Sequence, residues 1–196
     1  KTTGNDPGVV SGQSITIGGA SVSTKNWSVS GKTYSEQTTI SKFIDYVKTK
    51  KTSLINNGSI VANKINILSG NQTITEAMLS GKRPSIVIVE GSITLSGASL
   101  NASNQQQIIM ATGTITFPTT MSVANGLYIA DSLDFGTTAN QGIKIIGNII
   151  AQSSFSNARQ WSDWKKPGLF LIFDPSHYIE MLDMLSTITY DWRQIQ

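Results

Sequence analysis

The chain has 196 residues, of which 39% are hydrophobic and 14% are charged, with a formal charge of +3 and no cysteine. This length fits one domain, and so low a charged fraction excludes a disordered, highly charged tail. Without cysteine, neither disulfides nor thiolate-bound zinc can hold the fold. The basic residues are scattered apart from Lys48, Lys50 and Lys51, so nucleic acid is not an expected partner.

No stretch approaches the roughly 20 consecutive apolar residues of a membrane-spanning helix. The chain also begins at Lys1 without a signal peptide. Its composition, rich in hydroxyl and amide side chains, indicates β structure outside the cytosol, so we expect an extracellular or cell-surface domain that meets a membrane only through an anchor upstream of Lys1.

The N-terminal part, residues 1–37, is rich in Gly, Ser and Thr and predicts short strands at 14–17 and 28–30. Residues 38–52 predict an amphipathic helix that begins after a threonine N-cap. Its apolar side chains recur at i, i+3, i+4 and i+7, namely Ile40, Phe43, Ile44 and Val47.

An internal repeat follows within residues 58–151. The segments 60–67, 88–95 and 110–117 superimpose without gaps, and a shorter copy at 129–135 and a looser one at 145–150 follow. The copies begin 28, 22, 19 and 16 residues apart. Such repetition is typical of a solenoid.

Each full copy contains two alternating runs that meet at a small or polar pair such as Gly91-Ser92. Alternation with period two predicts strands with one buried face, and glycine permits a sharp bend between them. Because stacked copies share an apolar column, we predict a mainly β, single-stranded β-solenoid with irregular rungs. The predicted column is Ile65, Ile93, Ile115 and Leu133. An antiparallel sandwich is the alternative, since its short strands also recur.

Residues 152–196 are expected to cap the solenoid. Asp174-Pro175-Ser176 is a good helix start, and an apolar stripe follows at Tyr178, Met181, Leu182 and Leu185. An uncovered apolar stripe favours aggregation, so the helix is expected to fold onto the final rung around Ile145 and Ile149.

Four aromatic residues gather near the C-terminus: Trp161, Trp164, Tyr190 and Trp192. Such side chains most often seal a cap, and we expect that here. The alternative is a recognition site, because exposed aromatic rings stack on sugars or on a partner protein.

From position 126 onward the order of features is Gly126-Leu127-Tyr128-Ile129-Ala130-Asp131, Ile143-Lys144-Ile145-Ile146-Gly147-Asn148-Ile149-Ile150-Ala151, Arg159, Phe173-Asp174-Pro175 and Tyr190-Asp191-Trp192-Arg193. This order resembles the C-terminal region of secreted, type IV pilus-associated, PilX-like proteins of candidate-phylum bacteria. The resemblance covers roughly the last 110 residues. It implies a surface-located β-solenoid near a pilin-like anchor, with pilus or cell-envelope components as partners and no catalytic residues.

Candidate catalytic and metal-binding groups are few. His177 is the sole histidine, and no GxSxG motif and no cysteine accompany it, so we expect no nucleophilic relay. Asp131 and Asp134 point to opposite faces of a regular strand, which disfavours joint calcium ligation. No metal and no cofactor are expected.

The expected function is a non-catalytic adhesive or structural module at the cell surface or on a pilus, with a host surface or a glycan as ligand. A polysaccharide lyase or glycosidase is the enzymatic alternative, but Glu90, Asp131 and Lys144 fall at different positions in their repeats.

Ice binding is a further alternative, because ladders of outward threonines match a regular solid. Ser92 and Thr94 align with Thr114 and Thr116. The flanking copies supply other residues at these positions, namely Lys64 and Asn66 before them and Ser132 and Asp134 after them. Two rungs are too few for a lattice.

Overall fold

The computed structural model describes residues 9–10, 28–29, 39–50, 53–55, 58–161 and 166–185. The chain divides into two compact units, Lys1–Thr38 and Thr39–Gln196. In the first unit, β1 (Val9–Val10) pairs in parallel with β2 (Ser28–Val29). The predicted strand at 28–30 is therefore confirmed, and the one at 14–17 lies outside the described residues.

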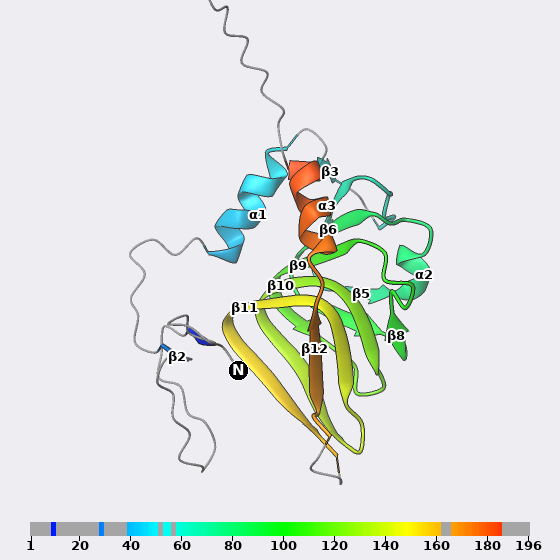
Figure 1. The fold of residues 1–196 in the computed structure, drawn as a ribbon. Helices are drawn as coiled ribbons and strands as arrows, with labels where there is room; N and C mark the ends of the chain where they lie inside the picture. Colours follow the sequence, from blue (N-terminus) through cyan, green and yellow to red (C-terminus); the bar gives the residue numbers. More distant parts are fainter. Residues whose placement is uncertain are drawn as a thin grey trace, which may run out of the picture. The chain divides into compact units, whose positions relative to one another are not determined.

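The second unit is a parallel β-solenoid (Figure 1). Its first wall has the strand order β12-β11-β10-β9-β6-β4-β3, and each neighbouring pair is parallel. This arrangement confirms the predicted fold class and excludes the antiparallel sandwich. The strands are β3 (Ser53–Ile55), β4 (Ile65–Ser69), β6 (Ser85–Glu90), β9 (Gln107–Thr116), β10 (Val123–Ala139), β11 (Ile143–Gln160) and β12 (Leu169–Phe173).

The second wall begins with β5 (Gln72–Thr75) and β7 (Ile93–Ser96), which pair in parallel. The long strands β9, β10 and β11 bend around the corner and contribute their C-terminal parts to it. A short strand, β8 (Ser99–Leu100), pairs with the start of β10.

Glycines let neighbouring rungs approach closely. A Cβ on Gly91, at the corner between β6 and β7, would lie 2.6 Å from the carbonyl oxygen of Gly70. Gly147 has a φ of +130°, and its Cβ would lie 2.0 Å from the carbonyl oxygen of Gly126. Only glycine fits where two backbones meet this closely and φ is positive.

The predicted buried column is correct for three of its four members. Ile93 pairs with Ile115, Ile115 pairs with Leu133, and all three are at most 1% exposed. Ile65 was wrongly assigned, because its partner is Ile86 on the first wall, whereas Gln72 is the neighbour of Ile93.

The register also corrects the repeat spacing. The first-wall column runs through Ile65, Ile86, Ile108, Leu127 and Asn148, which are 21, 22, 19 and 21 residues apart. The rungs are therefore more regular than the sequence comparison indicated. The predicted spacings of 28 and 16 were wrong, and those of 22 and 19 are confirmed.

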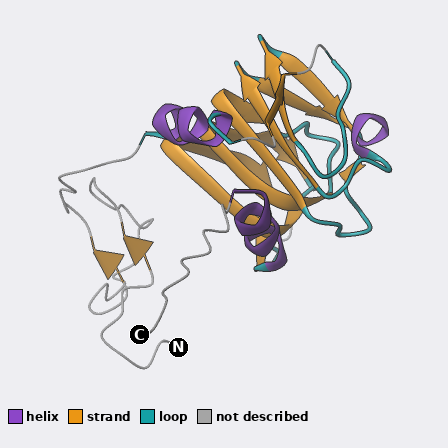
Figure 2. Cartoon of the chain, turned by 90° about the horizontal axis from the view of Figure 1, so that it is seen from above, coloured by secondary structure: helices purple, strands orange, loops and turns teal. Residues whose placement is uncertain are grey.

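Two helices cover the outward side of the first wall (Figure 2). They are α1 (Ile40–Lys48), which Thr39 caps through its bond from the Lys42 amide, and α3 (Ser176–Leu185). The strands β4, β6, β9 and β10 of the first wall are consequently buried on both sides, and residues 86–89 of β6 form a continuous apolar run, whereas β12 stays largely exposed. The buried side chains of this second core are Ile40, Ile44, Val47, Ile65, Ile67, Ile86, Ile88, Ile108, Met110, Leu127, Ile129 and Leu185. A one-turn helix, α2 (Glu76–Leu79), follows β5.

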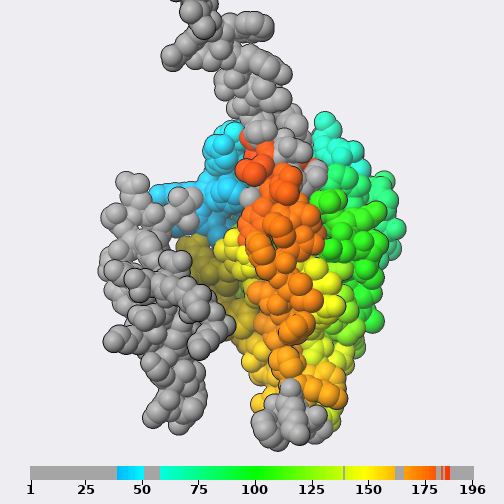
Figure 3. Space-filling view, viewed as in Figure 1, coloured from blue at the N-terminus to red at the C-terminus, as the bar shows by residue number. Residues whose placement is uncertain are grey.

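The predicted C-terminal helix forms, and the Asp174 carboxylate accepts a hydrogen bond from the Ser176 amide at its start. It does not lie over the end of the solenoid as expected. Leu185 packs on the outward side of the first wall instead. Phe155 and Leu171, whose rung partners Leu133 and Ile145 are buried, remain 50% and 42% exposed. β12 and α3 form a continuous orange band on the surface in Figure 3.

Candidate functional site

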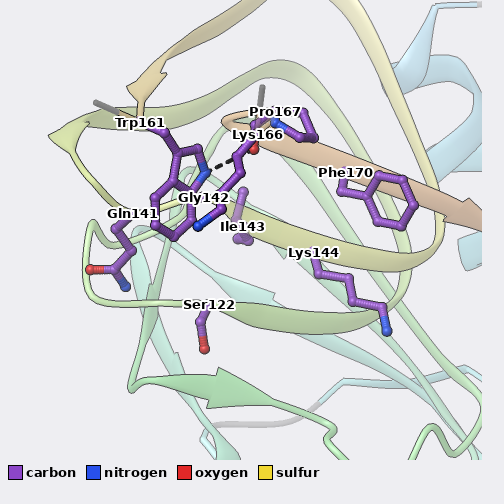
Figure 4. Close-up of a pocket in the computed structure, with 9 residues that line it drawn as sticks. All are labelled: Ser122, Gln141, Gly142, Ile143, Lys144, Trp161, Lys166, Pro167 and Phe170. Atoms are coloured by element: carbon purple, nitrogen blue, oxygen red, sulfur yellow. Dashed lines mark hydrogen bonds between the residues drawn. The ribbon is translucent and has the colours of Figure 1, made fainter. Parts of the chain in front are cut away.

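A shallow cleft of about 460 Å³ lies beside the turns that lead into the last three strands of the first wall (Figure 4). It is formed by the turns that precede β10, β11 and β12, which are distant from one another in the sequence. We call it the Trp161 cleft. Its lining residues are Ser122, Gln141, Gly142, Ile143, Lys144, Trp161, Lys166, Pro167 and Phe170.

Trp161 forms one wall of this cleft. It follows the last residue of β11, and its Nε1 donates a hydrogen bond to the carbonyl oxygen of Pro167 over 3.0 Å. A Cβ on Gly142 would lie 2.7 Å from that nitrogen, so the glycine makes room for the indole. The ammonium group of Lys166 lies 5.3 Å from the ring centroid, within range of a cation–π contact.

Phe170 lies at the opposite end of the cleft (Figure 4), and this residue is 53% exposed. It is the register partner of Lys144 on the neighbouring strand, so these two side chains stand side by side. The buried Ile143 lies between the two aromatic residues. The described lining residues thus combine aromatic surface with two lysines and include no carboxylate.

Of the four aromatic residues named as an alternative recognition site, Trp161 is described by the structure and lines this cleft. Trp164, Tyr190 and Trp192 lie outside the described residues. Sequence reasoning missed Phe170 and considered Lys144 only for the lyase or glycosidase alternative. The available signal was Phe170 itself, a large aromatic within the fully apolar run of β12 at the end of the sheet.

His177 lies at a buried position remote from the cleft lining. It is fully buried, and its Nδ1 accepts a hydrogen bond from the Gln107 amide over 3.1 Å. Burial lowers the pKa of its imidazole, and the nearby Asp174 carboxylate opposes this shift. The neutral ring therefore supports the packing of α3 against β9.

Arg159 is also structural. Its guanidinium donates to the carbonyl oxygens of Phe135, Met121 and Pro118 over 2.6, 2.7 and 2.6 Å, and only 4% of the residue is exposed. Burial lowers the pKa of this group. Arg159 ties β11 to the turn between β9 and β10.

The register corrects one sequence expectation about carboxylates. Glu90 directly follows Val89, and Asp131 directly follows Ala130. Because Val89 and Ala130 both pair with Ala111 of β9, the two carboxylates lie at the same corner on either side of that strand. Glu90 forms an ion pair with Lys48, and Asp131 accepts hydrogen bonds from serine hydroxyls. Among the described residues, no three His, Asp or Glu side chains gather as a metal site.

The outward side of the second wall carries in-register hydroxyls, and we call it the hydroxyl face. One ladder contains Thr73, Thr94, Thr116, Asp134 and Ser156, and a second contains Ser92, Thr114, Ser132 and Ser154. Opposite Thr94 lies Thr73, not Lys64 or Asn66, so the expectation of only two threonine rungs was wrong. The threonine ladder spans three rungs.

No family model, no curated protein and no solved structure matches this chain. Within the described residues, each helix is too short or too polar to traverse a bilayer.

Proposed function

We propose that this domain is a non-catalytic adhesive module of the bacterial surface that binds a carboxylate-bearing glycan in the Trp161 cleft. The observation that carries the proposal is the composition of the cleft, with aromatic rings at both ends and lysines beside them.

A sugar ring has an apolar C–H face and a hydroxyl rim. Trp161 and Phe170 provide rings on which the apolar face can stack. Gln141 supplies an amide that donates and accepts hydrogen bonds, and the Ser122 hydroxyl, which already donates to the Ala98 carbonyl oxygen, can accept one. These are the parts that small-ligand sites use for affinity and orientation.

The lysines favour an acidic glycan over a neutral one. Lys144 and Lys166 place two positive charges at the cleft, and the described lining residues include no carboxylate to neutralise them. A uronate or sialic acid carboxylate would pair with these ammonium groups.

The surface location rests on the resemblance to pilus-associated proteins, which implies pilus or cell-envelope partners. The adhesive role agrees with the engagement of the candidate catalytic groups, since Glu90 is paired with Lys48, Asp131 accepts from serine hydroxyls and His177 is buried. No specific observation favours the lyase or glycosidase alternative.

Calorimetric titration with oligogalacturonate and a neutral galactan oligomer tests the proposal. The acidic oligomer should bind more tightly, and Phe170→Ala should weaken binding at least about ten-fold because one stacking surface is lost. Lys144→Glu should weaken binding of the acidic oligomer selectively.

The matched control is Lys64→Glu, because Lys64 is exposed and lies outside the cleft. If the parent binds no acidic glycan, or if Phe170→Ala and Lys144→Glu bind as tightly as Lys64→Glu, the Trp161 cleft is not a glycan site.

A further inference from the structure

The hydroxyl face is an ordered array on the second wall. In β7, Thr94 is exposed between the buried Ile93 and Leu95, and the same alternation places Thr73 outward in β5. Every member of the two ladders of the hydroxyl face except Asp134 carries a hydroxyl group, and none is a lysine or an arginine.

The spacing of this array follows from the backbone. Neighbouring rungs of a parallel sheet lie about 4.8 Å apart, and outward residues of one strand recur about every 6.7 Å. The two ladders therefore form a two-dimensional grid of small side chains. A rigid grid matches a ligand that repeats in two dimensions better than it matches a single dissolved molecule.

Several of these side chains are held in place by neighbours. The Ser154 hydroxyl donates to the Ser132 hydroxyl over 2.9 Å, and the Ser92 hydroxyl accepts from the Thr114 amide over 3.2 Å. Asp134 accepts from the Gly136 amide over 2.9 Å. Because these groups are already ordered, binding of a solid costs little further side-chain entropy.

The chemistry of the grid favours a neutral hydrogen-bonding solid. Hydroxyls both donate and accept hydrogen bonds, as water does, and the near absence of charge complements an uncharged surface. Each contact is weak, but a fixed array makes many contacts at once. A crystalline polysaccharide also repeats its hydroxyls, yet flat sugar chains call for aromatic stacking, and the two ladders hold no aromatic residue.

We propose that the hydroxyl face binds the surface of ice crystals. This site is separate from the Trp161 cleft and shares no residue with it. Its ligand is ordered water at a crystal plane, so it adds a second adhesive activity that does not depend on a glycan.

The test is partition of fluorescently labelled protein into slowly growing ice, together with thermal hysteresis. The parent should concentrate in the ice. Thr94→Tyr, a bulky change between Thr73 and Thr116 in the first ladder, should lower the ice-bound fraction about ten-fold because the large ring holds the neighbouring hydroxyls away from the ice. Thr94→Lys is the second variant, and unchanged circular dichroism and melting establish that each variant is folded.

Ser103→Tyr is the matched control, since Ser103 is exposed in the turn between β8 and β9 and belongs to neither ladder. It should partition like the parent, as should Phe170→Ala, which alters only the cleft. The proposal is overturned if the parent is excluded from ice, or if folded Thr94→Tyr and Thr94→Lys partition like the parent. Binding to microcrystalline cellulose or chitin without binding to ice would overturn it in favour of a polysaccharide surface.

Discussion

Ile93 and Ile115 stack on adjacent rungs as register partners, and both side chains are completely buried. The parallel ladder fixes their distance, so a gap at either position cannot close without moving a whole rung. The second wall therefore depends on this contact, as does the hydroxyl face on its other side.

Ile93→Ala should lower the free energy of unfolding by about 2–4 kcal/mol, because it opens a cavity between stacked neighbours. Urea denaturation of the parent and the variant measures the change. Thr94→Ala is the control on the exposed side of the same strand and should change stability by about 0.5 kcal/mol or less. A loss below about 1 kcal/mol for Ile93→Ala would show that this column is not the core.

Gly147→Ala should destabilise the solenoid by about 3 kcal/mol or more, because its Cβ would collide with the Gly126 carbonyl oxygen and φ is unfavourable. Gly81→Ala separates the two causes. Gly81 has a φ of +68° but no atom near its Cβ, so only backbone strain of about 1–2 kcal/mol is expected. Equal decreases in the melting temperature of Gly147→Ala and Gly81→Ala would contradict the close packing of the rungs.

Arg159→Met should cost about 2–4 kcal/mol, because it leaves buried carbonyl oxygens without donors. Arg159→Lys should recover part of the loss, since an ammonium reaches fewer of these acceptors than the guanidinium fork. Chemical denaturation compares both variants with Lys144→Met, a change at an exposed lysine. Equal stability of Arg159→Met and Lys144→Met would assign Arg159 to the surface.

Stability should fall as the pH drops from 7.5 to 5.5. Burial lowers the pKa of His177 in the folded state, so the unfolded chain takes up a proton near its ordinary value of about 6.5 before the folded chain does. The stabilising contribution of the neutral His177 ring is complete above about pH 6.5 and is lost as the pH falls below it. Asp174, with a pKa of about 2, stays ionised throughout this range.

His177→Asn is the matched variant for this pH dependence, because its side-chain oxygen can still accept the Gln107 amide. Its melting temperature should change less between pH 7.5 and 5.5 than that of the parent. His177 is the sole histidine, so no second imidazole confuses the comparison. Identical slopes for both proteins would show that His177 does not carry the effect.

We expect no hydrolytic or lyase activity, although Glu90 and Asp131 share a corner of the solenoid. Purified protein incubated with acidic and neutral polysaccharides should yield neither reducing ends nor unsaturated sugars. Turnover that persists through purification and disappears in Glu90→Gln or Asp131→Asn would establish an enzyme at this corner.

The β-solenoid could be predicted because its signals are local. Alternation around Ile93 and Ile115 reports one buried face in each strand, and the repetition of that pattern indicates stacking. The helix at 40–48 was predictable for the same reason, since its apolar spacing lies within one element. Ile65 was misplaced because Ile65-Asn66-Ile67 alternates like a strand of the second wall, although Asn66 is buried and this strand belongs to the first wall, which is covered on both sides here.

The candidate sites depend on contacts that no local pattern encodes. Trp161 was expected to seal the cap, with recognition as the alternative, but the cleft exists only because turns near positions 122, 142 and 167 meet at one corner. The hydroxyl ladder could be recognised only from the pairing of Thr73 with Thr94, and the register between rungs sets that pairing. The sequence by itself determined that stacked rungs form, which face of their alternating strands is buried, and where the helices form. Tertiary stacking decided which rungs are neighbours, because register is fixed by hydrogen bonds between segments about twenty residues apart.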